Sequence, residues 1–235
     1  MKSVLFLLFF ILTVTDALVK SHIKVWNNCP DTIWAGALFP GDPLGAGVKL
    51  VANDERHFDI PDAPYSGYIW PRTWCDDKMA NCYTGGCSHV ECSGRPPEFP
   101  ATRAYFELNG KNQKDIYWVS VENGYNIPIQ IQVFGADCEI AGGCLRDFDA
   151  NQMCPEEASI KLKSHVTVGC KSGCDLTKDP SECCTGEFHG SNCDPSFTRH
   201  HFEKCCPNMM SYEFDTRPHV NKTCEGRPNY LVQFC

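Results

Sequence analysis

Apolar and polar residues alternate, or strand-forming residues gather, in several short segments of the chain. Residues 22–25 and 129–133 alternate with a period of two, which is the pattern of a strand that buries one face. Residues 32–39 and 230–234 are rich in β-branched and aromatic residues, and such residues favour strands. These segments predict a mainly β protein.

Turn residues separate the predicted strands at four places, which are Gly41-Asp42-Pro43, Gly94-Arg95-Pro96-Pro97, Asn109-Gly110 and Asn123-Gly124. The best helical patterns are residues 156–163, which follow Pro155, and residues 195–204. Both lie where cysteines are dense. Because the chain has no internal repeat and no flexible linker, we expect a single domain after the N-terminal segment.

The N-terminal segment has the layout of a secretory signal peptide. Lys2 supplies a positive charge, residues 4–14 are apolar, and Thr15-Asp16-Ala17 is a small-x-small cleavage site. A membrane anchor is the alternative, but about 20 apolar residues are needed to span a bilayer. We therefore expect residues 1–17 to be removed, leaving residues 18–235 as a secreted, extracellular protein without a membrane anchor.

Composition and charge exclude further classes. Apolar residues make up 43% of the chain, which is enough for a core and excludes intrinsic disorder. The 21 basic and 29 acidic residues give a net charge of -8. This charge argues against nucleic acid or anionic lipid as a partner, because both require clustered Lys and Arg.

The role expected of the 17 cysteines depends on the cellular compartment. Spacings such as Cys87 to Cys92 or Cys170 to Cys174 fit zinc ligands in a cytosolic protein, whereas secretion favours disulfides. An odd number leaves one thiol free, capped or bonded to another chain. The spacing alone leaves the connectivity open.

Four segments together resemble the thaumatin-like protein family, over about residues 22–235. They are Val25-Trp26-Asn27-Asn28-Cys29-Pro30, Ile69-Trp70-Pro71-Arg72-Thr73-Trp74-Cys75, Cys82-Tyr83-Thr84-Gly85-Gly86-Cys87 and Asn229-Tyr230-Leu231-Val232-Gln233-Phe234-Cys235. The resemblance implies a mainly β fold: a central β-sandwich, a disulfide-rich, helix-containing second lobe near residues 138–206, and a small looped third lobe near residues 75–92. It also implies a cleft between the first two lobes.

The resemblance further implies eight disulfides. The pairs carried over are Cys29 with Cys235, Cys75 with Cys82, Cys87 with Cys92, Cys138 with Cys224, Cys144 with Cys206, Cys154 with Cys170, Cys174 with Cys183, and Cys184 with Cys193. Cys205 is left over. We expect a monomer with a buried Cys205 thiol, and a Cys205-linked dimer is the alternative.

In many members of the family the cleft is acidic, and glucan binding or weak endo-β-1,3-glucanase activity is attributed to it. This chain departs from that pattern at each lining position. An Arg is replaced by Tyr68, a Glu by Tyr105, and Asp residues by Trp118, Asn123, Asn208 and Gly86.

The loss of these acids affects catalysis directly. Hydrolysis of a glycosidic bond generally requires two carboxyl groups, about 5 to 5.5 Å apart for retention or 6.5 to 9.5 Å for inversion. Tyr, Trp and Asn supply neither role well. A displaced pair would use Glu107, two residues after Tyr105 on the same strand face, and Glu122, beside Asn123.

Rings and amides suit the apolar faces and hydroxyls of a neutral sugar. We therefore expect a secreted defence or recognition protein that binds a neutral glycan, such as cell-wall β-glucan, without cutting it. The expected ligand-binding residues are Tyr68, Tyr105, Trp118, Asn123 and Asn208. In the alternative, the aromatic side chains pack together and fill the cleft. A weak glucanase with displaced carboxylates and a protein-binding enzyme inhibitor are the other functions that remain open.

Three further candidates receive simpler interpretations. Arg72 is expected to be structural, since five donors beside a cysteine-rich loop suit backbone carbonyls. His200 and His201 are not expected to bind metal, because adjacent side chains diverge on a helix or strand. No cofactor is expected. The sequon Asn221-Lys222-Thr223 predicts glycosylation at Asn221 in a eukaryotic host.

Overall fold

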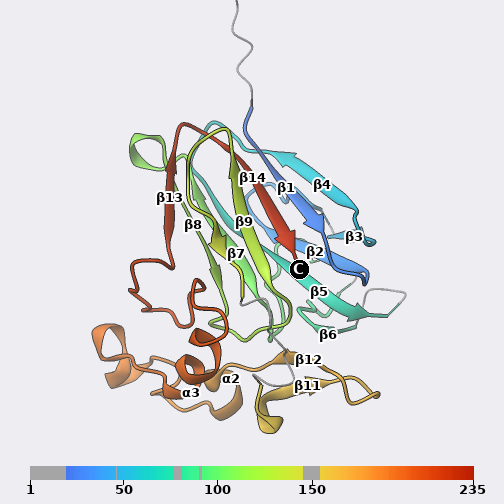
Figure 1. Cartoon of the computed structure of the whole chain (residues 1–235), viewed down its shortest axis with the longest axis vertical. Helices are drawn as coiled ribbons and strands as arrows, with labels where there is room; N and C mark the ends of the chain where they lie inside the picture. The colour runs from blue at the N-terminus through green and yellow to red at the C-terminus, as the bar shows by residue number, and fades with distance from the viewer. Residues whose placement is uncertain (1–19, 46, 77–80, 90–91, 145–153) are drawn as a thin grey trace, which may run out of the picture.

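The computed structural model describes residues 20–45, 47–76, 81–89, 92–144 and 154–235. The predicted signal peptide, residues 1–17, lies outside these residues. Two β-sheets pack face to face, and a lobe of short helices with a two-stranded sheet lies at the lower ends of their strands (Figure 1). The predicted mainly β class, with a sandwich and a helix-containing lobe, is confirmed.

The five-stranded sheet has the order β10-β9-β14-β1-β4. The first and last strands of the chain, β1 and β14, lie side by side in parallel, and the Cys29–Cys235 disulfide joins the segments that follow them. The strands are β1 (His22–Asn27), β4 (Glu55–Asp59), β9 (Ile129–Phe134), β10 (Ala141–Gly142) and β14 (Asn229–Phe234).

The larger sheet has the order β13-β8-β7-β5-β2-β3, and β6 pairs with β5. Neighbouring strands in it are antiparallel. The strands are β2 (Ile33–Leu38), β3 (Val48–Leu50), β5 (Tyr65–Cys75), β6 (Cys82–Thr84), β7 (Arg103–Leu108), β8 (Lys114–Ser120) and β13 (Lys222–Glu225), and the 3₁₀ turn η1 (Lys111–Gln113) precedes β8.

The core lies between the two sheets because alternate side chains of each strand face inward. In β1, for example, Ile23 and Val25 are fully buried while their neighbours are partly exposed. Tyr230 links the sheets: its ring packs 5.3 Å from those of Phe106 and Tyr117. Strands predicted at residues 22–25, 32–39, 129–133 and 230–234 are confirmed.

The second lobe contains one correct and one wrong helix prediction. Residues 195–204 are helical, as α3 (Ser196–Thr198) followed by the π-helical turn η5 (Arg199–Glu203). Residues 156–163 are not a helix, since only η2 (Glu156–Ala158) is helical there and β11 (Ser159–Lys161) follows it. β11 pairs with β12 (Thr167–Cys170), and this tertiary pairing prevails over a weak local helix preference. The lobe also contains α2 (Gly173–Thr177), η3 (Gly186–Phe188) and η4 (Gly190–Asn192).

Eight disulfides brace the fold, and their pairs coincide with those that the resemblance implies. They are Cys29–Cys235, Cys75–Cys82, Cys87–Cys92, Cys138–Cys224, Cys144–Cys206, Cys154–Cys170, Cys174–Cys183 and Cys184–Cys193. Cys205 is a free, half-buried thiol. Over the residues that the structure describes, no helix is long and apolar enough to cross a membrane.

The Cys29–Cys235 bridge closes a loop of 206 residues, whereas Cys75–Cys82 closes one of only 7. Loop entropy then predicts that replacing both Cys29 and Cys235 by Ser lowers the free energy of unfolding by about 5 kcal/mol. The matched replacement of Cys75 and Cys82 should cost about 2.5 kcal/mol. Denaturant unfolding of the two variants measures the difference, and equal losses would contradict the prediction.

Candidate functional site

Three aromatic side chains form a row across the larger sheet. Tyr68 on β5 is in register with Tyr105 on β7, which is in register with Trp118 on β8. Residues in register on adjacent strands point to the same face. The rings of Tyr68 and Tyr105 are 5.0 Å apart, and those of Tyr105 and Trp118 are stacked at 4.9 Å with an interplanar angle of 5°.

This aromatic row lines a groove of about 520 Å³, a size that suits a small ligand. The groove is also lined by Phe106 and Glu107 of β7 and by residues of β2, β5 and the turn after β2, namely Leu38, Phe39, Pro40, Ser66 and Gly67. None of these residues comes from the helix-containing lobe. The hollow therefore belongs to the sheet itself, which differs from the expectation of a site lined by both lobes.

Gly67 lets the segment of Leu38 and Phe39 pack closely against β5. A Cβ atom at this position would lie 2.2 Å from the carbonyl oxygen of Leu38 and 2.5 Å from the ring of Phe39. The three rings of the aromatic row contact one another, as the alternative prediction required, yet all three are partly exposed. They line the groove without filling it.

Arg103 extends the aromatic row, and sequence reasoning missed it. Its guanidinium carbon lies 5.0 Å from the ring centre of Tyr105 and 5.5 Å from that of Tyr68, within the range of cation–π contacts. The residue is only 7% exposed, and its Nε has no hydrogen-bond partner among the described residues. The signal was the alternation Arg103-Ala-Tyr105, which places both side chains on one face of β7.

The two tyrosines of the row are neutral at physiological pH. Burial raises the pKa of Tyr105, and the positive charge of Arg103 offsets this only in part. Burial also raises the pKa of Tyr68, which Arg103 again opposes by its charge and by a hydrogen bond. The rings therefore present neutral hydroxyls beside a fixed cation.

Glu122 balances the charge of Arg103. A carboxylate oxygen of Glu122 lies 3.7 Å from Nη2 of Arg103. Burial raises the pKa of Glu122; the Arg103 charge lowers it, the nearby Glu213 carboxylate raises it, and a hydrogen bond from Asn123 lowers it. The net result is a carboxyl group that holds its proton to a higher pH than usual.

The two predicted asparagines are not in the groove. Asn123 is hydrogen-bonded to Glu122 and reaches the aromatic row only through the Glu122–Arg103 pair. Asn208 is exposed and is not among the residues that line the groove. A parallel bridge between Ser120 and Met210 brings the segment of Asn208 alongside the end of β8. The structure thus groups the three aromatic residues and leaves the two amides outside them.

The two candidate acids lie at different ends of β7. Glu107 is exposed and lines the groove. Glu122 contacts the Arg103 side chain, and Glu107 lies four residues along β7 from Arg103, which separates the backbones of Arg103 and Glu107 by about 13 Å. Glu107 is among the residues that line the groove and Glu122 is not, whereas glycoside hydrolysis needs two carboxyl groups beside one bond.

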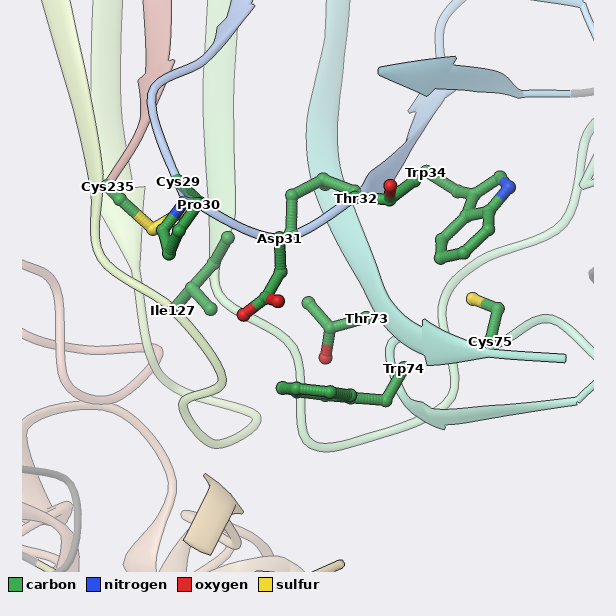
Figure 2. A pocket seen from close by; sticks show the side chains of 11 residues that line it. Cys29, Pro30, Asp31, Thr32, Trp34, Thr73, Trp74, Cys75, Ile127 and Cys235 are labelled. Atoms are coloured by element: carbon green, nitrogen blue, oxygen red, sulfur yellow. A yellow bond between two sulfur atoms is a disulfide. The ribbon is translucent and has the colours of Figure 1, made fainter. Parts of the chain in front are cut away.

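A second hollow, of about 260 Å³, lies beside the Cys29–Cys235 disulfide. Figure 2 shows the Asp31 carboxylate pointing into it between Ile127 and the ring of Trp74. Trp74 is 42% exposed and has a φ of 54°, a conformation that bulky side chains rarely adopt. This hollow contains none of the residues predicted for ligand binding.

The structure also places four other residues that the sequence singled out. Arg72 is fully buried, with Nη1 4.0 Å from the sulfur of Cys87, and burial lowers its pKa. Burial raises the pKa of the Cys205 thiol. The rings of His200 and His201 lie 4.9 Å apart edge to face, so the predicted divergence is wrong. The π-helical turn η5 has more residues per turn, which reduces the angle between successive side chains.

The fold and groove define a class: a disulfide-rich β-sandwich with a groove on one sheet. The sequence profile described as "Thaumatin family" matches residues 27–235. The chain therefore belongs to the thaumatin family, and the resemblance seen in the sequence is confirmed.

Known proteins similar to this chain include pathogenesis-related protein 5 of Arabidopsis thaliana. It is 36% identical over 240 residues, which cover 99% of this chain and 96% of the relative. A glucan endo-1,3-beta-glucosidase of Prunus avium is 31% identical over 224 residues, with 91% and 89% covered. The solved structure of a laminaripentaose-producing beta-1,3-glucanase with laminaritetraose aligns with a TM-score of 0.56 over 91% of this chain and 98% of that chain. At 9% identity, this likeness shows the fold alone.

The raised pKa of Glu122 generates a prediction. Its carboxyl group should titrate above the usual value of 4.5, and Arg103→Met should raise the pKa further by removing the attraction between the two charges. The folded state binds the Glu122 proton more tightly than the unfolded state does, so protonation of Glu122 stabilises the fold. This contribution to the free energy of unfolding is complete below pH 4.5 and is lost as the pH rises through the raised pKa.

Carbon-13 NMR titration of the carboxyl groups measures both effects. Asp215 serves as the control, since burial raises its pKa but hydrogen bonds from Arg217 and Ser211 lower it more. The pKa of Asp215 should not change in Arg103→Met. A pKa of Glu122 at or below 4.5, or one that is the same in the unchanged protein and in Arg103→Met, would contradict the assigned charge pair.

Proposed function

We propose that this protein is a secreted recognition protein of the thaumatin-like defence family that binds a neutral, β-glucan-like glycan in the groove and does not hydrolyse it. The aromatic row of Tyr68, Tyr105 and Trp118 is the observation that carries this proposal. Aromatic side chains offer apolar contact area together with polar atoms at their edges, which matches the mixed surface of a sugar. The groove volume of about 520 Å³ lies within the range of small-ligand sites.

The charges around the groove favour a neutral ligand. Arg103 and Glu122 compensate each other, and the two tyrosine hydroxyls of the row stay protonated. Glu107 is the single carboxylate among the described residues that line the groove. A strongly charged ligand would therefore find no complementary cluster, whereas hydroxyl groups would find donors and acceptors along the rim.

The separation of the acids supports binding without cleavage. Glu107 lines the groove, while Glu122 does not and is paired with Arg103, so the groove offers one carboxyl group where hydrolysis needs two. The disulfide frame and the N-terminal segment support export, because disulfides persist in oxidising compartments. A secreted binder of wall glycan would recognise its ligand outside the cell.

A weak endo-β-1,3-glucanase is the second candidate, and Glu122 is the observation that favours it. Its raised pKa is typical of a general acid, and the Glu213 carboxylate lies close enough to contribute to that rise. A relative of this chain is named as a glucan endo-1,3-beta-glucosidase. In this function Glu122 would donate the proton and Glu213 would be its partner.

Sedimentation with insoluble β-1,3-glucan, paired with an assay for released reducing sugar, tests the proposal. We expect the protein to bind without sugar release, and Trp118→Ala to weaken binding at least tenfold, which corresponds to about 1.4 kcal/mol. Trp74→Ala is the matched control, because Trp74 is an exposed tryptophan of the second hollow (Figure 2). It should bind as well as the unchanged protein.

Each other outcome has a defined meaning. Sugar release that disappears in Glu122→Gln would support the glucanase and contradict a binder that does not cut. An equal loss of binding in Trp74→Ala and Trp118→Ala would contradict the groove as the site. Absence of binding in the unchanged protein would overturn the glycan proposal as a whole.

A further inference from the structure

The sequon Asn221-Lys222-Thr223 lies next to the aromatic row. β13 pairs antiparallel with β8, with Lys222 opposite Tyr117 and Thr223 opposite Ile116. Continuing this register by one residue places Asn221 next to Trp118 on the adjacent strand. Side chains that are paired in this way lie about 5 Å apart at their Cβ atoms.

The alternation of the strand sets the face on which Asn221 lies. Tyr117 is buried in the core, and the side chain of Lys222 opposite it is only 11% exposed. Asn221 and Thr223 on either side of Lys222 are both exposed. They therefore share the outer face of the sheet with Trp118.

The ring of Trp118 has one face covered and one face turned toward the sequon. Tyr105 on β7 stacks on it in parallel, at an angle of 5°. β7 and β13 flank β8 on opposite sides. The second face of the Trp118 ring consequently faces the side of β13, and Asn221 immediately precedes that strand.

We propose that an N-linked glycan is attached to Asn221 and that its first sugar packs on the second face of the Trp118 ring, closing this end of the groove. The attachment rests on the export included in the proposed function. In the attachment reaction, Nδ2 of Asn221 bonds to the anomeric carbon of a lipid-linked oligosaccharide. The bond from that carbon to the lipid pyrophosphate breaks, the pyrophosphate leaves with the bonding electrons, and Nδ2 loses one proton to the base of the host transferase.

A sugar held on Trp118 competes with free glycan for the same ring. The attached glycan cannot diffuse away, so it has a high local concentration at this position. The glycosylated protein should therefore bind β-glucan more weakly than the protein without the glycan. Glycosylation would thus regulate the groove.

The test uses the full chain secreted from a eukaryotic host that adds N-glycans. Intact mass should show one glycan, which is lost in Asn221→Gln and in Thr223→Ala. Acrylamide quenching of tryptophan fluorescence then reports the packing. The quenching attributable to Trp118, obtained by difference from Trp118→Phe, should increase about twofold when the glycan is lost, because a covered ring face becomes free.

A displaced glycan is the matched control. Lys114→Thr creates a sequon at Asn112, an exposed residue before the opposite end of β8. Combined with Thr223→Ala, it moves the glycan away from Trp118, and quenching should equal that of Asn221→Gln. Secretion without a glycan at Asn221, or equal quenching with and without it, would overturn the inference.

These readouts separate the inference from the proposed function. Mass and quenching need no added ligand, so they hold even if the protein fails to bind β-1,3-glucan. If the protein does bind, the glycosylated form should bind severalfold more weakly than Asn221→Gln. Equal binding of the two forms would contradict the closing of the groove.

Discussion

The cross-strand register of β5, β7 and β8 is the constraint on which the site depends. Because strand side chains alternate between faces, a shift of one residue would exchange Tyr105 with Phe106 and bury the site. The inward set of side chains prevents this shift. Phe106, Tyr117 and Tyr230 pack together in the core, and the hydroxyl of Tyr230 donates to Asp115 at 2.6 Å. The packing of the core therefore fixes the row of rings outside it.

The disulfides add a second level of constraint, on the segments around the sheets. Cys29–Cys235 closes the sandwich by joining the two ends of the described fold, and Cys138–Cys224 holds the segment before β10 to β13. β13 is the edge strand that carries the sequon, and it lies beside Trp118 on β8. The covalent frame and the groove are thus connected through one strand.

The sequence predicts the strands well because period-two alternation is a direct result of burying one sheet face. It fails at residues 156–163, where a helical pattern gives way to the pairing of β11 with β12. The aromatic side chains of the groove could be named from the family resemblance, but their stacking depends on register between distant segments. Arg103 was missed because the alternation that puts it on the same face as Tyr105 does not show that its guanidinium packs on the rings. Asn208 lies elsewhere because loop geometry is not encoded in spacing.

The central claim is that sugar contacts the aromatic row and no other hollow. NMR titration with laminaritetraose, following the indole N–H signals of the five tryptophans, tests it most directly. The account predicts that the Trp118 signal shifts in a saturable way, that the Trp74 signal stays in place, and that the tetrasaccharide remains intact. A shift confined to Trp74 and Trp34, or cleavage of the sugar during the titration, would contradict it.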